Sequence, residues 1–141
     1  MSQFDREFNW KYICHCKNAA WINLPLYGYR INPYSVTQKS ASWRKTDLLK
    51  AVKRVEDYLA EQKCSFSDEF NSYMYARAMW AVAKTFAVKG NKKLFKRLGE
   101  EYDVRACMRV TKKDSNKLVC LASKLYLINS NLFYRVVKLK K

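Results

Sequence analysis

The sequence predicts a mainly α-helical protein whose first 39 residues hold one helix and an extended segment. From residue 40 onward, apolar side chains recur every three or four residues, which is the spacing of one helix face. Both prolines and one of the three glycines fall between residues 24 and 38, which indicates a loop or sheet edge there. Hydrophobic residues make up 49% of the 141 residues, so the chain has enough apolar side chains to form a core.

The first predicted helix lies within FDREFNWKYICHCKN, residues 4–18. Phe4, Phe8 and Tyr12 recur at steps of four, and acidic residues occupy the first turn, where the helix dipole favours them. A short extended piece follows around Trp21. Pro25, which lacks a backbone donor, then starts a path that we expect to be a loop or sheet edge.

Helices are predicted for most of the remaining chain. Residues 40–63 carry an apolar stripe and begin at a candidate cap, Ser40 or Ser42; the stripe consists of Leu48, Val52, Val55 and Leu59. Residues 65–90 place Ser67 before two acids and end at Gly90, as a helix should.

Two more helices complete the predicted set. A shorter one, over residues 91–102, has an apolar side formed by Leu94, Phe95, Leu98 and Tyr102. The last one follows the polar stretch TKKDSN, is expected to break near Asn129–Asn131, and has an apolar stripe of Leu118, Leu121, Leu125 and Ile128.

The five cysteines are odd in number and irregular in spacing, which favours reduced thiols in a cytosolic protein over a disulfide framework. The tripeptide at Cys14, His15 and Cys16 invites a zinc site. On a helix, residues one and two apart do not share a face, so these three side chains cannot converge. We expect no metal site here, and instead buried cysteines beside a surface histidine.

The net charge of +16 is concentrated in the second half of the chain. Residues 1–70 hold eleven Lys/Arg against eight Asp/Glu, a balance of +3, whereas residues 71–141 hold seventeen against four, a balance of +13. Such a field attracts polyanions, either nucleic acid or an anionic lipid surface. The sequence has neither a run of roughly 18 apolar residues nor a signal-peptide pattern, so we expect a cytoplasmic protein.

Residues 4–38 contain an ordered series of short motifs. An acid and, after two variable residues, a phenylalanine open the predicted helix at Asp5 and Phe8. A Pro-Leu-Tyr-x-Tyr-Arg stretch and a Ser-x-Thr follow, formed by Pro25, Leu26, Tyr27, Tyr29, Arg30, Ser35 and Thr37. In this order and spacing the series resembles the closing part of the catalytic domain of bacterial family 2 glycosyltransferases, which have the GT-A fold. The resemblance implies that residues 1–39 are a remnant of that α/β domain and that residues 40–141 are a basic helical extension.

The same resemblance implies inverting transfer of a sugar from a nucleotide-sugar donor to a saccharide or lipid-linked saccharide acceptor, as in polysaccharide biosynthesis. Asp5 matches the catalytic base of the family, which takes the proton from the attacking acceptor hydroxyl. The alternative reading is that Asp5 only caps the helix.

The loop that follows would edge the acceptor and diphosphate site. Tyr27 and Tyr29 would stack on a sugar or base, Arg30 would pair with phosphate oxygens, and Ser35 would add a hydroxyl contact. Alternatively, the two tyrosines pack on the sheet and Arg30 pairs with an acid. For Arg30 the residues leave the two readings equally open.

The chain also departs from the family pattern. Phe4 stands where the family usually has glutamate. Asp5 and Glu7 imitate the acid-x-acid signature that holds the metal, but that signature follows a hydrophobic strand, so we reject a metal site here. The donor-binding half, and the Mn or Mg expected with it, belong to the full-length family member. We therefore expect this chain to be inactive by itself.

Two alternatives come from the basic helices. Lys and Arg alternate with Trp, Tyr, Phe and Leu, which suits an amphipathic helix on an anionic membrane; the protein would then be peripheral at the inner face of the cell membrane. Nucleic acid is the weaker alternative, because no helix-turn-helix, zinc or sheet signature is legible and the basic residues spread over several helices.

Overall fold

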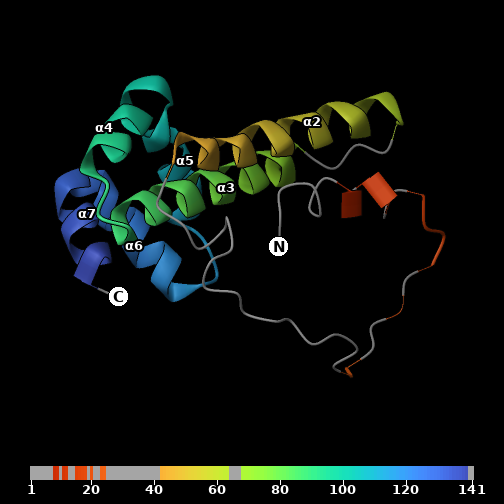
Figure 1. Cartoon of the computed structure of the whole chain (residues 1–141). Coiled ribbons are helices and arrows are strands. Elements are labelled where there is room, and N and C mark those ends of the chain that lie inside the picture. Colours follow the sequence, from red (N-terminus) through yellow and green to blue (C-terminus); the bar gives the residue numbers. More distant parts are fainter. Residues whose placement is uncertain are drawn as a thin grey trace.

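The computed structural model describes residues 8–9, 11–12, 15–18, 20, 23–24, 42–63 and 68–139. Within these ranges the chain is mainly helical and has no strand, which confirms the predicted helical class (Figure 1). The elements are the 3-10 turn η1 (Trp43–Thr46) and the helices α2 (Asp47–Glu61), α3 (Asp68–Val88), α4 (Lys92–Glu101), α5 (Val104–Thr111), α6 (Lys117–Ile128) and α7 (Ser130–Leu139). None of these helices is long and apolar enough to cross a membrane.

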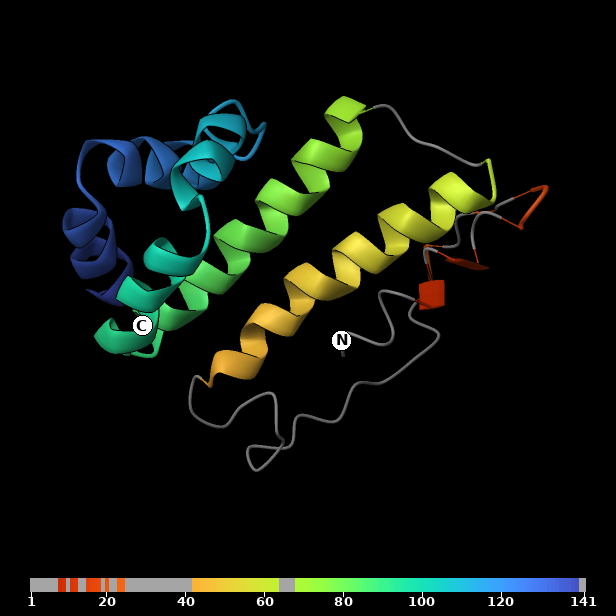
Figure 2. The same ribbon diagram turned by 90° about the horizontal axis from the view of Figure 1, so that it is seen from above.

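Helix α3 is the centre of the bundle. It lies between α2 on one side and the C-terminal helices on the other (Figure 2). Its buried residues fall on more than one face, as expected of a helix covered on several sides; they are Ala76, Ala78, Met79, Val82, Ala83, Phe86 and Ala87. The four alanines allow the neighbouring helices to approach α3 closely.

An aromatic cluster joins α4, α6 and α7. The ring of Phe95 lies 5.2 Å from Tyr134, 5.9 Å from Phe133 and 6.0 Å from Tyr126, measured between centroids. All four side chains are buried. Since aromatic rings contribute large buried areas, this cluster fixes α7 against α4.

The turn from α3 to α4 is tightly specified. Gly90 has φ +70°, a left-handed conformation that glycine adopts without steric cost. The amides of Gly90 and Asn91 donate to the carbonyls of Ala87 and Phe86, which is the Schellman arrangement at a helix end. The side chain of Asn91 then accepts from the amide of Leu94 and caps α4. The predicted stop at Gly90 is thereby confirmed.

Short polar side chains begin the next three helices in the same way. Asp103 accepts from the amide of Ala106 at the start of α5, and Asn116 accepts from the first turn of α6. Asn129 accepts from the amides of Asn131 and Leu132 at the start of α7. The predicted break in the last helix therefore lies at Asn129, where the capping bonds replace helical ones.

Several expectations are corrected. Helix α5 was not predicted from the sequence. Ser42 precedes η1 without a side-chain capping bond. The predicted apolar stripe of α6 faces outward at Leu118, Leu121 and Ile128, and the helix instead buries Val119, Ser123 and Tyr126.

The N-terminal expectations are also corrected in part. Residues 8, 9, 11 and 12 are helical, but residues 15–18 are not. Cys16 is exposed rather than buried, whereas His15 beside it is exposed as expected. The helix predicted within residues 4–18 therefore ends before residue 15. The residues of its predicted apolar stripe that the structure describes are exposed.

A buried carboxylate ties the turn between α5 and α6 to α3. Asp114 accepts from the Tyr73 hydroxyl at 2.9 Å and from the amide of Asn116 at 2.8 Å. The Arg77 guanidinium lies 3.3 Å away, an ion pair whose geometry is not that of a hydrogen bond. The hydrogen bond from the Tyr73 hydroxyl to Asp114 raises the pKa of the Tyr73 phenol.

We predict that Asp114→Ala lowers the free energy of unfolding by about 2 to 3 kcal/mol, because it leaves two donors without their acceptor and the Arg77 guanidinium without its counter-charge. Urea unfolding followed by circular dichroism measures this loss. The matched control is Asp57→Ala, which removes an exposed carboxylate 3.8 Å from Lys53 and should cost less than about 0.5 kcal/mol. Equal losses in the two variants would contradict the role of Asp114.

Candidate functional site

The site residues predicted from the sequence, Asp5, Tyr27, Tyr29, Arg30 and Ser35, lie outside the described residues. The described residues nearest to them in sequence are exposed. Phe8 and Tyr12 stack on each other with ring centroids 5.9 Å apart, and Leu24 is exposed to a similar degree. These three large apolar side chains are therefore left uncovered.

The segment around His15 contacts α2 through one tyrosine. His15 Nε2 lies 2.7 Å from the Tyr58 hydroxyl, and the Lys11 ammonium lies 4.9 Å from the centre of the same ring. The thiol of Cys16 points to the carbonyl of Tyr12. Among the described residues, no group of three His, Cys, Asp or Glu side chains could hold a metal ion.

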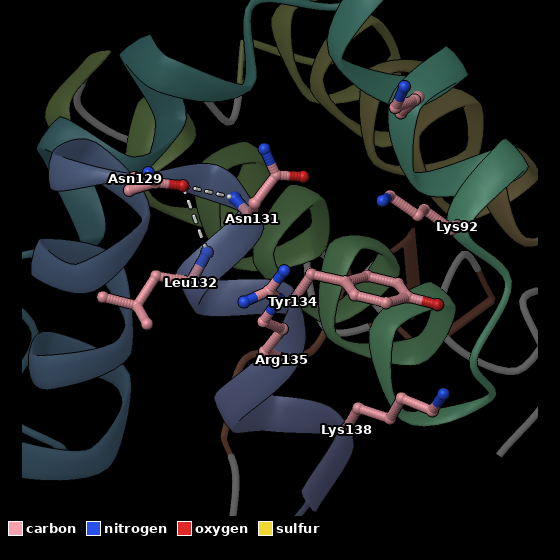
Figure 3. A pocket seen from close by; sticks show the side chains of 8 residues that line it. Lys92, Asn129, Asn131, Leu132, Tyr134, Arg135 and Lys138 are labelled. Carbon is pink, nitrogen blue, oxygen red and sulfur yellow. Dashed lines mark hydrogen bonds between the residues drawn. The ribbon is translucent and has the colours of Figure 1, made fainter.

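A cationic pocket lies between α4 and α7. Lys92 and Lys96 line it from α4, and Arg135 and Lys138 line it from α7. Figure 3 shows Lys92, Arg135 and Lys138 around it. The cavity has a volume of about 670 Å³, and its other lining residues are Asn129, Asn131, Leu132 and Tyr134. None of the described residues that line it is acidic.

Helix spacing explains why these cations converge. Lys92 and Lys96 are four residues apart, and Arg135 and Lys138 are three apart, so each pair shares one side of its helix. The aromatic cluster of Phe95, Tyr126, Phe133 and Tyr134 holds the two helices together beside the pocket. Burial of the aromatic faces therefore brings two lysines and two further cations to one place.

These four cations make no ion pair within the part of the chain that the structure describes. The contrast is Arg97, also on α4, which bonds to Glu101 and lies 4.2 Å from the centre of the Trp43 ring. The positive charge of the pocket is consequently not neutralised by neighbouring described carboxylates.

Large apolar side chains are exposed on α6 and on α7, and we name the two sets together the C-terminal apolar row. It consists of Leu118, Leu121, Ile128, Leu132, Val136 and Leu139. The spacings of three and seven in α6, and of four and three in α7, keep the members within each helix on one side of that helix. The exposed cations Lys117 and Lys124 stand four residues before and three residues after Leu121, on the same side of α6.

The sequence predicted a basic helical body but missed the pocket. The signal for the pocket was present as the pairs Lys92/Lys96 and Arg135/Lys138, each of which adjoins a buried aromatic residue of its helix. The missing information was that α4 and α7 pack together, which depends on long-range contacts.

A second groove, of about 770 Å³, lies among α2, α3 and α5 and contains one cysteine. Burial, and secondarily the Asp103 carboxylate, raises the pKa of the Cys107 thiol to about 11. Burial likewise raises the pKa of the Tyr75 phenol, which lines the same groove. A thiol with so high a pKa is protonated at neutral pH and is a poor nucleophile.

No protein-family model matches this chain, and neither the search of curated proteins nor the search of solved structures found a match. The comparisons therefore assign neither a family nor a fold relative.

We predict that Cys107 is alkylated far more slowly than Cys16 in the folded protein at pH 8, because raising the pKa from 9.0 to about 11 lowers the thiolate fraction about 100-fold. Iodoacetamide labelling followed by peptide mass spectrometry measures both sites. In urea the two rates should become similar; a native rate equal to that of Cys16 would contradict the prediction.

The same raised pKa predicts a loss of stability in alkali. The folded state holds the thiol proton more tightly, so the contribution of Cys107 is complete below pH 9 and disappears as the pH rises through about 11. Urea titrations across this range should show a smaller fall for Cys107→Ala than for the original chain. An identical fall in both proteins would assign the alkaline loss to other groups, such as the tyrosines.

Proposed function

We propose that this chain is the acceptor-side, C-terminal part of an inverting family 2 glycosyltransferase. The observation that carries the proposal is the ordered series of motifs from Asp5 to Thr37, because a single motif would be weak and the whole series at this spacing is specific. In the proposal, residues 1–39 belong to the catalytic domain and residues 40–141 are its helical extension.

The uncovered side chains in the N-terminal segment support the proposal. Phe8 is 66% exposed, Tyr12 is 62% exposed and Leu24 is 66% exposed. The stacked rings of Phe8 and Tyr12 form contiguous apolar surface, of the kind that often marks a contact with another part of a protein. These exposures are what a catalytic-domain segment would have when its packing partners lie in other residues.

The proposed reaction is a single displacement. The acceptor hydroxyl oxygen attacks the anomeric carbon, the bond from that carbon to the nucleotide diphosphate breaks, and the Asp5 carboxylate takes the hydroxyl proton. Arg30 would balance charge on the departing diphosphate, because a guanidinium matches two phosphate oxygens at once. Tyr27, Tyr29 and Ser35 would position the sugar.

We predict that the 141-residue chain alone transfers no sugar. In this proposal its residues form the acceptor side and the extension, and none of them forms the nucleotide-binding half. The decisive test uses a longer protein, obtained by sequencing the coding region before Met1 and expressing any in-frame continuation. The release of nucleoside diphosphate by this protein is then measured. In the longer enzyme, Asp5→Asn should lower kcat about 100-fold or more while leaving donor affinity unchanged.

The matched control is Glu7→Gln, which removes a carboxylate from the same short stretch and should preserve turnover. Arg30→Ala should weaken donor binding. Robust transfer by the short chain, or full activity of the Asp5→Asn enzyme, would contradict the proposal.

The C-terminal apolar row favours a second candidate, docking of the helical extension on an anionic membrane. Ile128 is 79% exposed and Leu139 is 85% exposed, so apolar surface is available for the acyl region. Lys117, Lys124 and Arg135 lie beside the row, where they would meet anionic headgroups. This charge complementarity supports an anionic bilayer, rather than another helix, as the occupant that we propose.

We predict that the chain sediments with vesicles of phosphatidylserine and phosphatidylcholine but not with phosphatidylcholine alone, and that added salt weakens the binding. The double variant Leu121→Ser/Ile128→Ser should bind about tenfold more weakly, because it removes two inserting side chains. Leu24→Ser, at the same 66% exposure as Leu121, is the control and should bind normally. Binding to an oligonucleotide at moderate salt, with no dependence on lipid, would favour nucleic acid instead.

A further inference from the structure

We propose that the cationic pocket between α4 and α7 binds a phosphate-bearing anion. The inference rests on the pocket alone and holds whether or not the chain is a transferase. Its starting point is that Lys92, Lys96, Arg135 and Lys138 line one cavity, and that no residue lining it in the described part of the chain is acidic. The cavity, of about 670 Å³, falls within the usual range of small-ligand pockets.

Charge makes an anion the fitting occupant. Four cations around one cavity repel one another, and no described carboxylate pairs with any of them. A multivalent anion would relieve that repulsion at every member of the set. Arg135 would offer two parallel donors to a phosphate group, and the lysines would act as point charges around it.

The pocket has a firm wall. Tyr134 is only 7% exposed, and its ring packs on Phe95. Lys138 folds over the turn at Gly90, where a β-carbon would lie 3.4 Å from its Cε. The side-chain oxygen of Asn129 accepts from two backbone amides of α7. The side-chain nitrogen is therefore the atom that Asn129 offers to a ligand as a donor.

The shape and lining favour a compact phosphate over an extended nucleic acid. Single strands bind through aromatic faces on which bases stack, whereas Tyr134, the one aromatic residue among the described lining residues, is buried. The phosphate could belong to a soluble compound or to a lipid headgroup, since both present the same tetrahedral oxygens to the four cations.

Pyrophosphate is the soluble probe, and its binding to the full chain can be followed by titration calorimetry at low salt. Lys96→Glu and Arg135→Glu should each weaken this binding about tenfold or more, since each removes a charge-assisted hydrogen bond. Lys113→Glu is the matched control, because it makes the same change of net charge at an exposed residue outside the pocket and should change affinity less than about twofold. Lys96→Gln keeps the test valid if a reversed charge disturbs folding, and circular dichroism checks each variant.

A second arm uses vesicles that contain phosphatidic acid, whose headgroup is a phosphomonoester. If pyrophosphate binds, and the two pocket variants weaken this binding while Lys113→Glu does not, the pocket takes soluble phosphates. If the same differences among variants appear only with phosphatidic acid vesicles, the phosphate source is the lipid. Equal weakening by Lys113→Glu and Lys96→Glu would mean a general effect of charge and would overturn the proposal. Absence of binding in both arms would also overturn it.

Discussion

The bundle depends on α3, whose second half is buried around about half of its circumference and leaves the side of Arg77, Trp80 and Lys84 toward solvent. Between Ala76 and Ala87 its buried residues point in several directions, so neighbours must cover it on several sides. Helix α2 covers one side, while α5, α7 and α4 cover others. The turn at Gly90 then determines where α4 begins, and the ring of Phe95 on α4 determines where α7 lies.

The sequence predicted those helices whose periodicity agrees with their burial. In α4 the predicted side of Leu94, Phe95, Leu98 and Tyr102 is the buried or partly buried side, and Gly90 ends α3 as expected. The eight residues of α5 were missed because so short a segment gives little periodic signal. Its capping residue, Asp103, was the local signal that could have found it.

Helix α6 was predicted, but with the wrong side buried, because its most regular leucine spacing lies on the exposed side. Two interactions turn the other face inward: the buried hydroxyls of Thr111 and Ser123 lie 2.8 Å apart, and Tyr126 joins the aromatic cluster. A hydroxyl pair between two helices cannot be read from either helix alone. The exposed leucines of α6 therefore either lower the solubility of the protein or form a binding surface. Their cationic neighbours favour a binding surface.

Helix α7 connects the two candidate binding surfaces. Leu132 lines the cationic pocket and is also a member of the C-terminal apolar row, so the two surfaces adjoin there. Arg135, three residues later, carries charge into the pocket, whereas Val136 and Leu139 continue the row. A phospholipid whose headgroup entered the pocket would therefore have its acyl chains beside apolar side chains, an advantage that a soluble phosphate lacks. On this geometry the lipid is the better of the two phosphate sources, because it alone would use both surfaces at once.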